Sequence, residues 1–103
     1  MTQPELLQRI KERLEALYGA RFRGLVLYGS VARGDADEES DIDLLCLLDV
    51  LKGNELWEIT KVLYPLQLEF DARELNVFPV DISRYEAAEY SLYREIHREG
   101  VLL

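Results

Sequence analysis

The sequence lacks the features that would place the chain in a membrane, in an oxidising compartment or on a nucleic acid. No apolar run approaches the roughly 20 residues that a membrane span needs, and a single cysteine, Cys46, excludes an internal disulfide. Only 12 Lys and Arg stand against 20 Asp and Glu, whereas a nucleic-acid binder needs a basic face. The first residues lack the basic segment and apolar core of a signal peptide. We therefore expect a cytoplasmic protein that binds neither membranes nor nucleic acid.

The length and composition are those of one folded unit. A chain of 103 residues can bury roughly two-thirds of its unfolded surface and fold alone. Its 49% hydrophobic and 31% charged residues are ordinary for a globular protein. We expect a single domain over residues 1–103.

Helical and extended patterns alternate along the chain. Thr2 and Glu5 have the spacing of a capping box, which predicts a helix through about residue 18 that Gly19 ends. A short strand follows over 24–28 and a first helical turn over 30–33. Residues 41–48 are almost continuously apolar after two aspartates, which predicts a strand that is buried on both faces.

The second half continues the alternation. Asn54 is placed to cap a helix whose inner face is Leu56, Ile59, Leu63 and Leu66, and Pro65 should kink or end that helix. Residues 76–82 read as a third strand, in which Pro79 indicates an edge or a bulge. Ser83, with Glu86 three residues on, should cap one final helix. This order predicts an α/β (α+β) fold with a small sheet flanked by helices.

Two aspartates on one strand are the strongest chemical signal. Asp41 and Asp43 are two residues apart, so both side chains should point to one face. Two like charges at the start of a buried strand repel each other unless a cation lies between them. Mg²⁺ prefers hard oxygen ligands and takes one or two carboxylates together with substrate phosphates. The pair therefore predicts a magnesium site.

The preceding turn has the residues of a phosphate site. Gly29 lets a backbone approach a phosphate closely, and Ser30 adds a hydroxyl donor. Arg33 can pair with a phosphate. Gly34 permits a turn, and Ser40 can form a hydrogen bond near Asp41.

Together these residues spell a known signature. The run G-S-V-A-R-G, five residues, and then S-D-I-D-L resembles the signature of the DNA polymerase β-like nucleotidyltransferases. The chain is similar to their minimal form, the MNT domain, over nearly its whole length. The resemblance implies a mixed sheet flanked by helices, with Gly29 and Ser30 on the triphosphate and Asp41 and Asp43 on Mg²⁺. It also implies ATP as the substrate and a small helical HEPN-type toxin as the partner, since some relatives transfer AMP to a toxin tyrosine.

The third carboxylate of that family has no clear counterpart here. The favoured register over residues 75–83 puts Asn76 in its slot, and asparagine can offer an oxygen to a metal but cannot take a proton. Asp81 lies on the same strand with the opposite parity, so only a bulge at Pro79 would turn it to the site. Glu69 and Asp71 lie just before the strand and could reach in from a loop.

Three functions remain open from the sequence. The first is transfer of a nucleotide, AMP from ATP, onto a protein hydroxyl. The second is an antitoxin that neutralises its partner by contact and keeps a weak or degenerate nucleotide site, which the acidic composition and Asn76 favour. The third is modification of a small molecule such as an aminoglycoside, which usually requires an added substrate domain.

Overall fold

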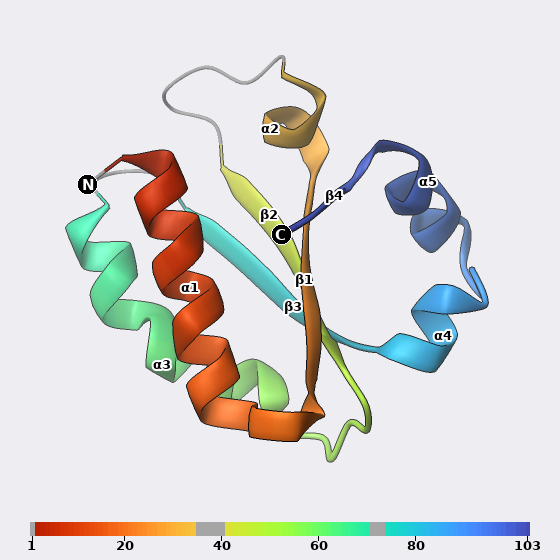
Figure 1. The fold of residues 1–103 in the computed structure, drawn as a ribbon, viewed down its shortest axis with the longest axis horizontal. Coiled ribbons are helices and arrows are strands. Elements are labelled where there is room, and N and C mark those ends of the chain that lie inside the picture. Colours follow the sequence, from red (N-terminus) through yellow and green to blue (C-terminus); the bar gives the residue numbers. More distant parts are fainter. Residues whose placement is uncertain (1, 35–40, 71–73) are drawn as a thin grey trace.

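The computed structural model describes residues 2–34, 41–70 and 74–103, and Figure 1 shows them as a ribbon. Helices and strands alternate over most of that length. In chain order the elements are α1 (Gln3–Tyr18), a 3-10 turn (Gly19–Arg21), β1 (Phe22–Tyr28), α2 (Gly29–Arg33), β2 (Ile42–Leu48), α3 (Glu55–Glu69), β3 (Leu75–Asp81), α4 (Ile82–Glu86), α5 (Ser91–Glu99) and β4 (Val101–Leu102).

The strands form one mixed sheet in the order β3-β2-β1-β4. β1 runs antiparallel to both β2 and β4, whereas β2 and β3 are parallel. β2 therefore lies inside the sheet, and six of its seven residues are buried. The predicted small mixed sheet with flanking helices and the buried strand over 41–48 are confirmed.

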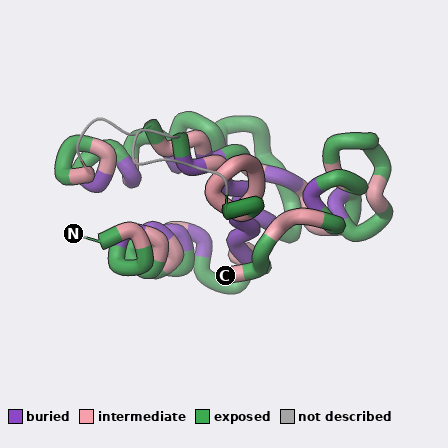
Figure 2. The backbone as a smooth tube through the Cα atoms, turned by 90° about the horizontal axis from the view of Figure 1, so that it is seen from above, coloured by how far each residue is buried: buried purple, intermediate pink, exposed green. Residues whose placement is uncertain are grey.

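Helices cover the two faces of the sheet unequally. α1 and α3 lie side by side on one face (Figure 1), where the larger apolar cluster includes Ile10, Leu14, Leu44 and Leu66. α4 and α5 cover part of the other face with a smaller cluster: Val26, Leu45, Leu47, Val80, Tyr85 and Ile96. Figure 2 shows buried residues in the middle of the molecule and along the inner sides of helical segments, whose outer sides are exposed. Gly29, Ser30 and Arg33 lie on α2, and Asp43 pairs with Tyr28 at the end of β1 next to α2.

The first helix forms as the sequence predicts. The Thr2 hydroxyl accepts a hydrogen bond from the Glu5 amide at 3.3 Å, and Gly19 ends the helix with a φ of 55°. The buried residues Leu6, Ile10, Leu14 and Tyr18 recur at helical spacing. A cap at each end suffices for this prediction because both signals are local in the sequence.

The structure contradicts one prediction about α3, that Leu56 lies on its inner face, and excludes one of the two alternatives given for Pro65. Leu56 is 50% exposed, and Glu55 is buried in its place with 2% exposure. The Glu55 carboxylate accepts hydrogen bonds from the Lys52 and Gly53 amides and from Arg21, which satisfy its buried charge. Pro65 does not end the helix, which continues to Glu69. Pro65 lies on the exposed side, where water can serve the carbonyl that its missing N–H leaves free.

The C-terminal segment also differs from the prediction. The expected single helix capped by Ser83 is two helices, and the Asp81 carboxylate is the cap because it accepts from the Ser83 amide at 2.9 Å. Ala88 separates α4 from α5 with a φ of 52°. β4, which the sequence did not indicate, then pairs with β1.

The prediction that Pro79 marks an edge or a bulge was also confirmed. Pro79 lies on β3, an edge strand, and the pairing of β3 with β2 runs without a bulge. Cys46 is fully buried, and burial raises the pKa of its thiol to about 12. None of the helices among the described residues combines the length and the apolar character of a membrane-spanning segment.

Candidate functional site

The candidate site is centred on Asp43, which lies on the interior strand β2. In the sheet register Asp43 stands between Tyr28 on β1 and Asn76 on β3. Residues directly opposite each other on neighbouring strands point to the same face. That face carries the smaller apolar cluster, against which Tyr28 packs. The sheet thus brings three polar side chains from three strands into one row.

Gly29 lies directly against the Asp43 carboxylate. Its φ is 78°, and a Cβ built on it would lie 2.5 Å from Asp43 Oδ2. A side chain at this position would be strained by the backbone and would also collide with the carboxylate. The glycine therefore leaves the backbone and the carboxylate in direct contact, with no side chain between them.

Asn76 is the residue that the sheet places next to Asp43. Its Nδ2 donates to Asp43 Oδ1 at 3.1 Å, so the register that the sequence favoured is the observed one. Asp81 pairs with Leu48 at the opposite end of the two strands and caps α4. Glu69 is exposed and pairs with Arg9. Asp71 lies outside the described residues.

Asp41 precedes β2 by one residue and is exposed. The start of β2 beside it is fixed by a hydrogen bond from the Ile42 amide to the Glu74 carbonyl at 2.9 Å. Asp41 and Asp43 share a parity along the chain, which directs both toward the same side. Ser40, which the sequence singled out with them, lies outside the described residues.

Ser30 and Arg33 lie on the short helix α2. Ser30 is half-buried, and its hydroxyl makes no hydrogen bond within the part of the chain that the structure describes. Arg33 Nη1 lies 3.7 Å from Glu99 Oε2 at the end of α5. Gly34 ends the helix with a φ of 79°, and its amide donates to the Ser30 and Val31 carbonyls.

Two residues of this region were missed by the sequence reasoning. Burial, and the negative charge of Asp43 beside it, raise the pKa of the Tyr28 hydroxyl, which places that hydroxyl in the field of the carboxylate. Tyr28 immediately precedes Gly29 and shares the strand parity of Val26. Its position in the sequence could therefore have indicated that its side chain lies next to the site. Glu99 gave no such signal, because only the pairing of β4 with β1 brings it to α2.

The donor atoms at this site fit a hard divalent cation. Asp43 supplies carboxylate oxygens, Asn76 has a carboxamide oxygen, and Asp41 stands exposed at the start of the strand. Oxygen ligands of this kind suit Mg²⁺. Among residues 2–34, 41–70 and 74–103, no group of three or more His, Cys, Asp or Glu is arranged to hold a metal. The described residues therefore offer two carboxylates and one amide.

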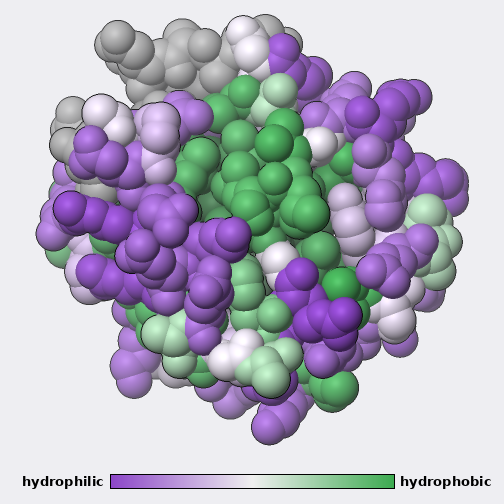
Figure 3. Space-filling view, in the orientation of Figure 1, coloured by the Kyte–Doolittle hydropathy of each residue, from purple (hydrophilic) through white to green (hydrophobic). Residues whose placement is uncertain are grey.

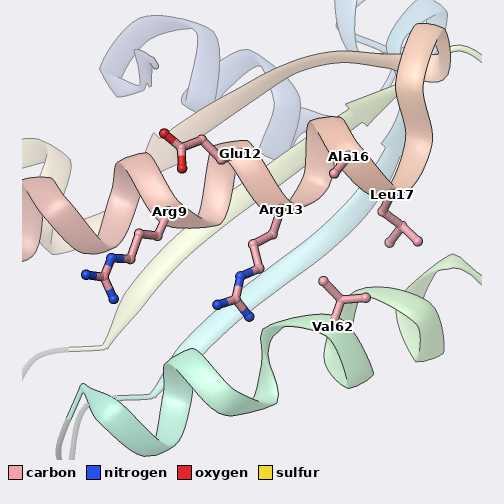
Figure 4. A pocket seen from close by; sticks show the side chains of 6 residues that line it. All are labelled: Arg9, Glu12, Arg13, Ala16, Leu17 and Val62. Carbon is pink, nitrogen blue, oxygen red and sulfur yellow. The ribbon is translucent and has the colours of Figure 1, made fainter.

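A separate hollow lies on the opposite side of the sheet. It occupies about 620 Å³ and is lined by residues of α1 and α3. In Figure 4, Arg9 and Arg13 point toward α3, whereas Glu12 points away from it. The hollow lies outside the helical layer that covers the larger apolar cluster, whereas Asp43 lies on the other face. It is not part of the Asp43 site.

Several curated proteins are similar to this chain. One from Methanocaldococcus jannaschii, named "putative protein adenylyltransferase", is 40% identical over 50 residues, which are 48% of this chain and 50% of that protein. Another of the same name and organism is 32% identical over 68 residues, which are 65% of this chain and 69% of that protein. The chain thus spans about half the length of the first relative.

Two solved structures share the fold. A structure described as a "putative nucleotidyltransferase" from Sulfolobus solfataricus has a TM-score of 0.61 at 19% identity, and the match covers 95% of this chain and 76% of that one. A structure described as a toxin-antitoxin with AMP-PNP has a TM-score of 0.62 at 20% identity and covers 92% of this chain and 70% of that one.

The family of the chain follows from the sequence match and the fold together. The profile of the nucleotidyltransferase domain family matches residues 7–103. That range contains the Gly29–Asp43 contact and all four strands of the sheet. The chain belongs to the nucleotidyltransferase domain family.

Proposed function

We propose that this chain is a Mg²⁺-dependent nucleotidyltransferase that transfers AMP from ATP to a protein hydroxyl, as the antitoxin-type partner of a small helical HEPN protein. The observation that carries the proposal is the contact between the Gly29 backbone and the Asp43 carboxylate, with Asn76 beside it. A glycine backbone next to a carboxylate leaves room for a triphosphate, and the carboxylate can hold the cation that the triphosphate brings with it.

The proposal gives the site residues the roles that the sequence motif implies. Asp41 and Asp43 would hold Mg²⁺, and Gly29, Ser30, Arg33 and Ser40 would contact the nucleotide. Bound Mg²⁺ supplies neutralising charge for the triphosphate. The acceptor hydroxyl oxygen bonds to the α-phosphorus of ATP, the bond from that phosphorus to the β-bridging oxygen breaks, and pyrophosphate leaves. Because Asn76 cannot take a proton, the acceptor proton passes to water.

The nature of the partner is supported by the relatives and by the surface. The curated relatives are named for protein adenylylation, and one structural neighbour is a toxin-antitoxin. Figure 3 shows apolar residues gathered at the centre of one face, where β1, β4 and the C-terminus lie in Figure 1. Val101 and Leu102 of β4 are 44% and 70% exposed. An exposed apolar patch with a polar rim is typical of a protein-binding surface.

Asn76 favours a second candidate function. With an amide beside Asp43, in place of a third carboxylate, the chain would bind its partner by contact and retain a weak or inactive nucleotide site. The substitution Asn76→Asp distinguishes the two functions, because it places a carboxylate that can accept a proton next to Asp43. Faster transfer by this variant supports the enzyme, whereas an unchanged absence of transfer supports the contact-only binder.

The first test is isothermal titration of ATP with Mg²⁺ into the wild type and into Asp41→Asn/Asp43→Asn. We expect Mg²⁺-dependent binding that the double variant loses. The charge-matched control is Glu12→Gln/Glu69→Gln, which removes two exposed carboxylates from α1 and α3 and should bind as the wild type does. Equal binding by all three proteins, or none at millimolar ATP, would contradict the nucleotide site.

The second test follows the transferred group. The chain is incubated with a co-purified helical partner and ATP labelled at the α-phosphate. Label on the partner together with released pyrophosphate is the expected result, and hydroxylamine-stable label is consistent with a hydroxyl acceptor. A tight complex that acquires no label would leave the contact-only function.

A further inference from the structure

The carboxylate of Glu99 on α5 lies beside Arg33 of α2, one of the residues proposed to contact the nucleotide. Arg33 is the last residue of α2, and its Nη1 lies 3.7 Å from Oε2 of Glu99, the last residue of α5. Sixty-five intervening positions separate the two in sequence, so the approach is made by the fold alone. Of these two elements, α2 follows directly on β1, and α5 leads into β4.

The sheet fixes the position of Glu99. Val101 pairs with Leu27 on β1, two residues before Gly29. Gly100 joins α5 to β4 in a space where a Cβ would lie 2.6 Å from the Ile96 carbonyl oxygen and 2.9 Å from Val26 Cγ1. Since only a glycine fits this junction, the end of α5 is held against β1. Both members of the ion pair are therefore anchored to the same strand.

The ion pair itself is loose. A separation of 3.7 Å exceeds hydrogen-bond distance, and the two side chains are 45% and 36% exposed. Exposed ion pairs of this kind are weak and screened by salt. A phosphate forms stronger, bidentate bonds with a guanidinium. An incoming polyphosphate would therefore compete with Glu99 for Arg33 and would also be repelled by the Glu99 carboxylate.

We infer that Glu99 is a positioning residue that occupies Arg33 and sets the affinity of the site for polyphosphates. This inference rests on the proposed function, because it takes Arg33 as a contact of the nucleotide phosphates. Glu99 withdraws Arg33 from the site when no nucleotide is bound and releases it when a triphosphate arrives. The C-terminal helix thereby tunes nucleotide binding through one charge.

The test compares Glu99→Gln with Glu95→Gln. Both substitutions remove from α5 one carboxylate that pairs with Arg98, but of the two only Glu99 also pairs with Arg33. At low ionic strength Glu99→Gln should tighten binding of ATP with Mg²⁺ by about two- to fivefold, whereas Glu95→Gln should leave it unchanged. The gain should shrink at higher salt, where exposed charges are screened.

Two further measurements exclude a merely structural effect. AMP, which lacks the β- and γ-phosphates, should bind Glu99→Gln and the wild type equally. In the Arg33→Ala background Glu99→Gln should give no gain, because the coupling between the two residues is then absent. Thermal unfolding of each variant shows whether the fold is kept.

The outcomes separate this inference from the proposed function. If the wild type binds ATP and Asp41→Asn/Asp43→Asn does not, the nucleotide site stands, and equal ATP affinities of Glu99→Gln and Glu95→Gln overturn the inference alone. A gain that persists without Arg33, or that is equal for AMP, also overturns it. If the wild type binds no ATP at all, both the inference and the nucleotide site are overturned.

Discussion

At the scale of single residues, two glycines with almost the same backbone conformation allow the effect of backbone strain to be measured apart from the effect of a steric clash. Gly29 and Gly34 have φ values of 78° and 79°, but of the two only Gly29 has a described atom in the place of a Cβ, namely Asp43 Oδ2 at 2.5 Å. Both Gly→Ala variants should lose about 1 kcal/mol of stability from the left-handed backbone. Gly29→Ala should in addition displace Asp43 and weaken binding of ATP with Mg²⁺ about tenfold. Urea unfolding and titration measure the two effects, and equal ATP affinities would show that the contact is dispensable.

Glu55 is a buried charged residue whose loss should cost considerable stability. Its carboxylate is 2% exposed and accepts from Arg21 Nη2 and the Lys52 amide at 2.6 Å and from the Gly53 amide at 2.8 Å. Glu55→Gln leaves Arg21 without its buried counter-charge and should cost about 3 kcal/mol. The exposed pair of Glu69 with Arg9 is the contrast, and Glu69→Gln should cost less than about 1 kcal/mol. Chemical denaturation of both variants decides whether burial makes this difference.

The same carboxylate gives the protein an acid-sensitive component of stability. Burial opposes ionisation of Glu55, but hydrogen bonds from the Lys52 and Gly53 amides and from Arg21 outweigh it and lower its pKa from 4.5 to about 2. A carboxyl group whose pKa is lower in the folded than in the unfolded state contributes its full stabilisation above the unfolded-state pKa. That contribution is lost as the pH falls through the folded-state pKa. Wild-type stability should therefore fall between about pH 5 and 2 by more than that of Glu55→Gln. If the free energy of unfolding depended on pH in the same way in both proteins, Glu55 would not be the source of the acid sensitivity.

At the scale of elements, α3 carries a proline that its surroundings tolerate. The helix runs from Glu55 to Glu69 with Pro65 inside it, because Ile59, Leu63 and Leu66 bury the inner face while Pro65 is exposed. Pro65→Ala restores a helical hydrogen bond and should stabilise the protein by about 1–2 kcal/mol. Lys61→Ala, on the same exposed side, should change stability by less than about 0.5 kcal/mol. Urea unfolding checks both, and a destabilised Pro65→Ala would mean that the kink serves packing.

At the scale of the whole molecule, the net charge of −8 predicts a dependence on salt and on Mg²⁺. Self-repulsion of like charge weakens the compact state, so added NaCl should raise the melting temperature by about 4 °C. At matched ionic strength, MgCl₂ should raise it by a further amount of about the same size, since a ligand of the native state stabilises by mass action. Asp43→Asn should keep the NaCl effect and lose the Mg²⁺ excess. An equal response to both salts would indicate screening alone.

The sequence by itself determined the features that depend on neighbours along the chain. The cap at Thr2, the end of α1 at Gly19 and the buried strand β2 were all predicted, because each signal lies within or next to a single element. The alternation of side chains along a strand also predicted that Asn76, rather than Asp81, would share a face with Asp43, and the observed register agrees. The family followed from residues 29–43, which form one continuous motif.

The tertiary structure alone decided what depends on residues far apart in sequence. Glu55 is buried because Arg21 meets it from the turn before β1. The helix expected after Ser83 is broken, and β4 forms because β1 offers a free edge. Glu99 reaches Arg33 only through that pairing. Local propensity cannot encode such contacts, since their free energy comes from partners that the chain brings together only on folding.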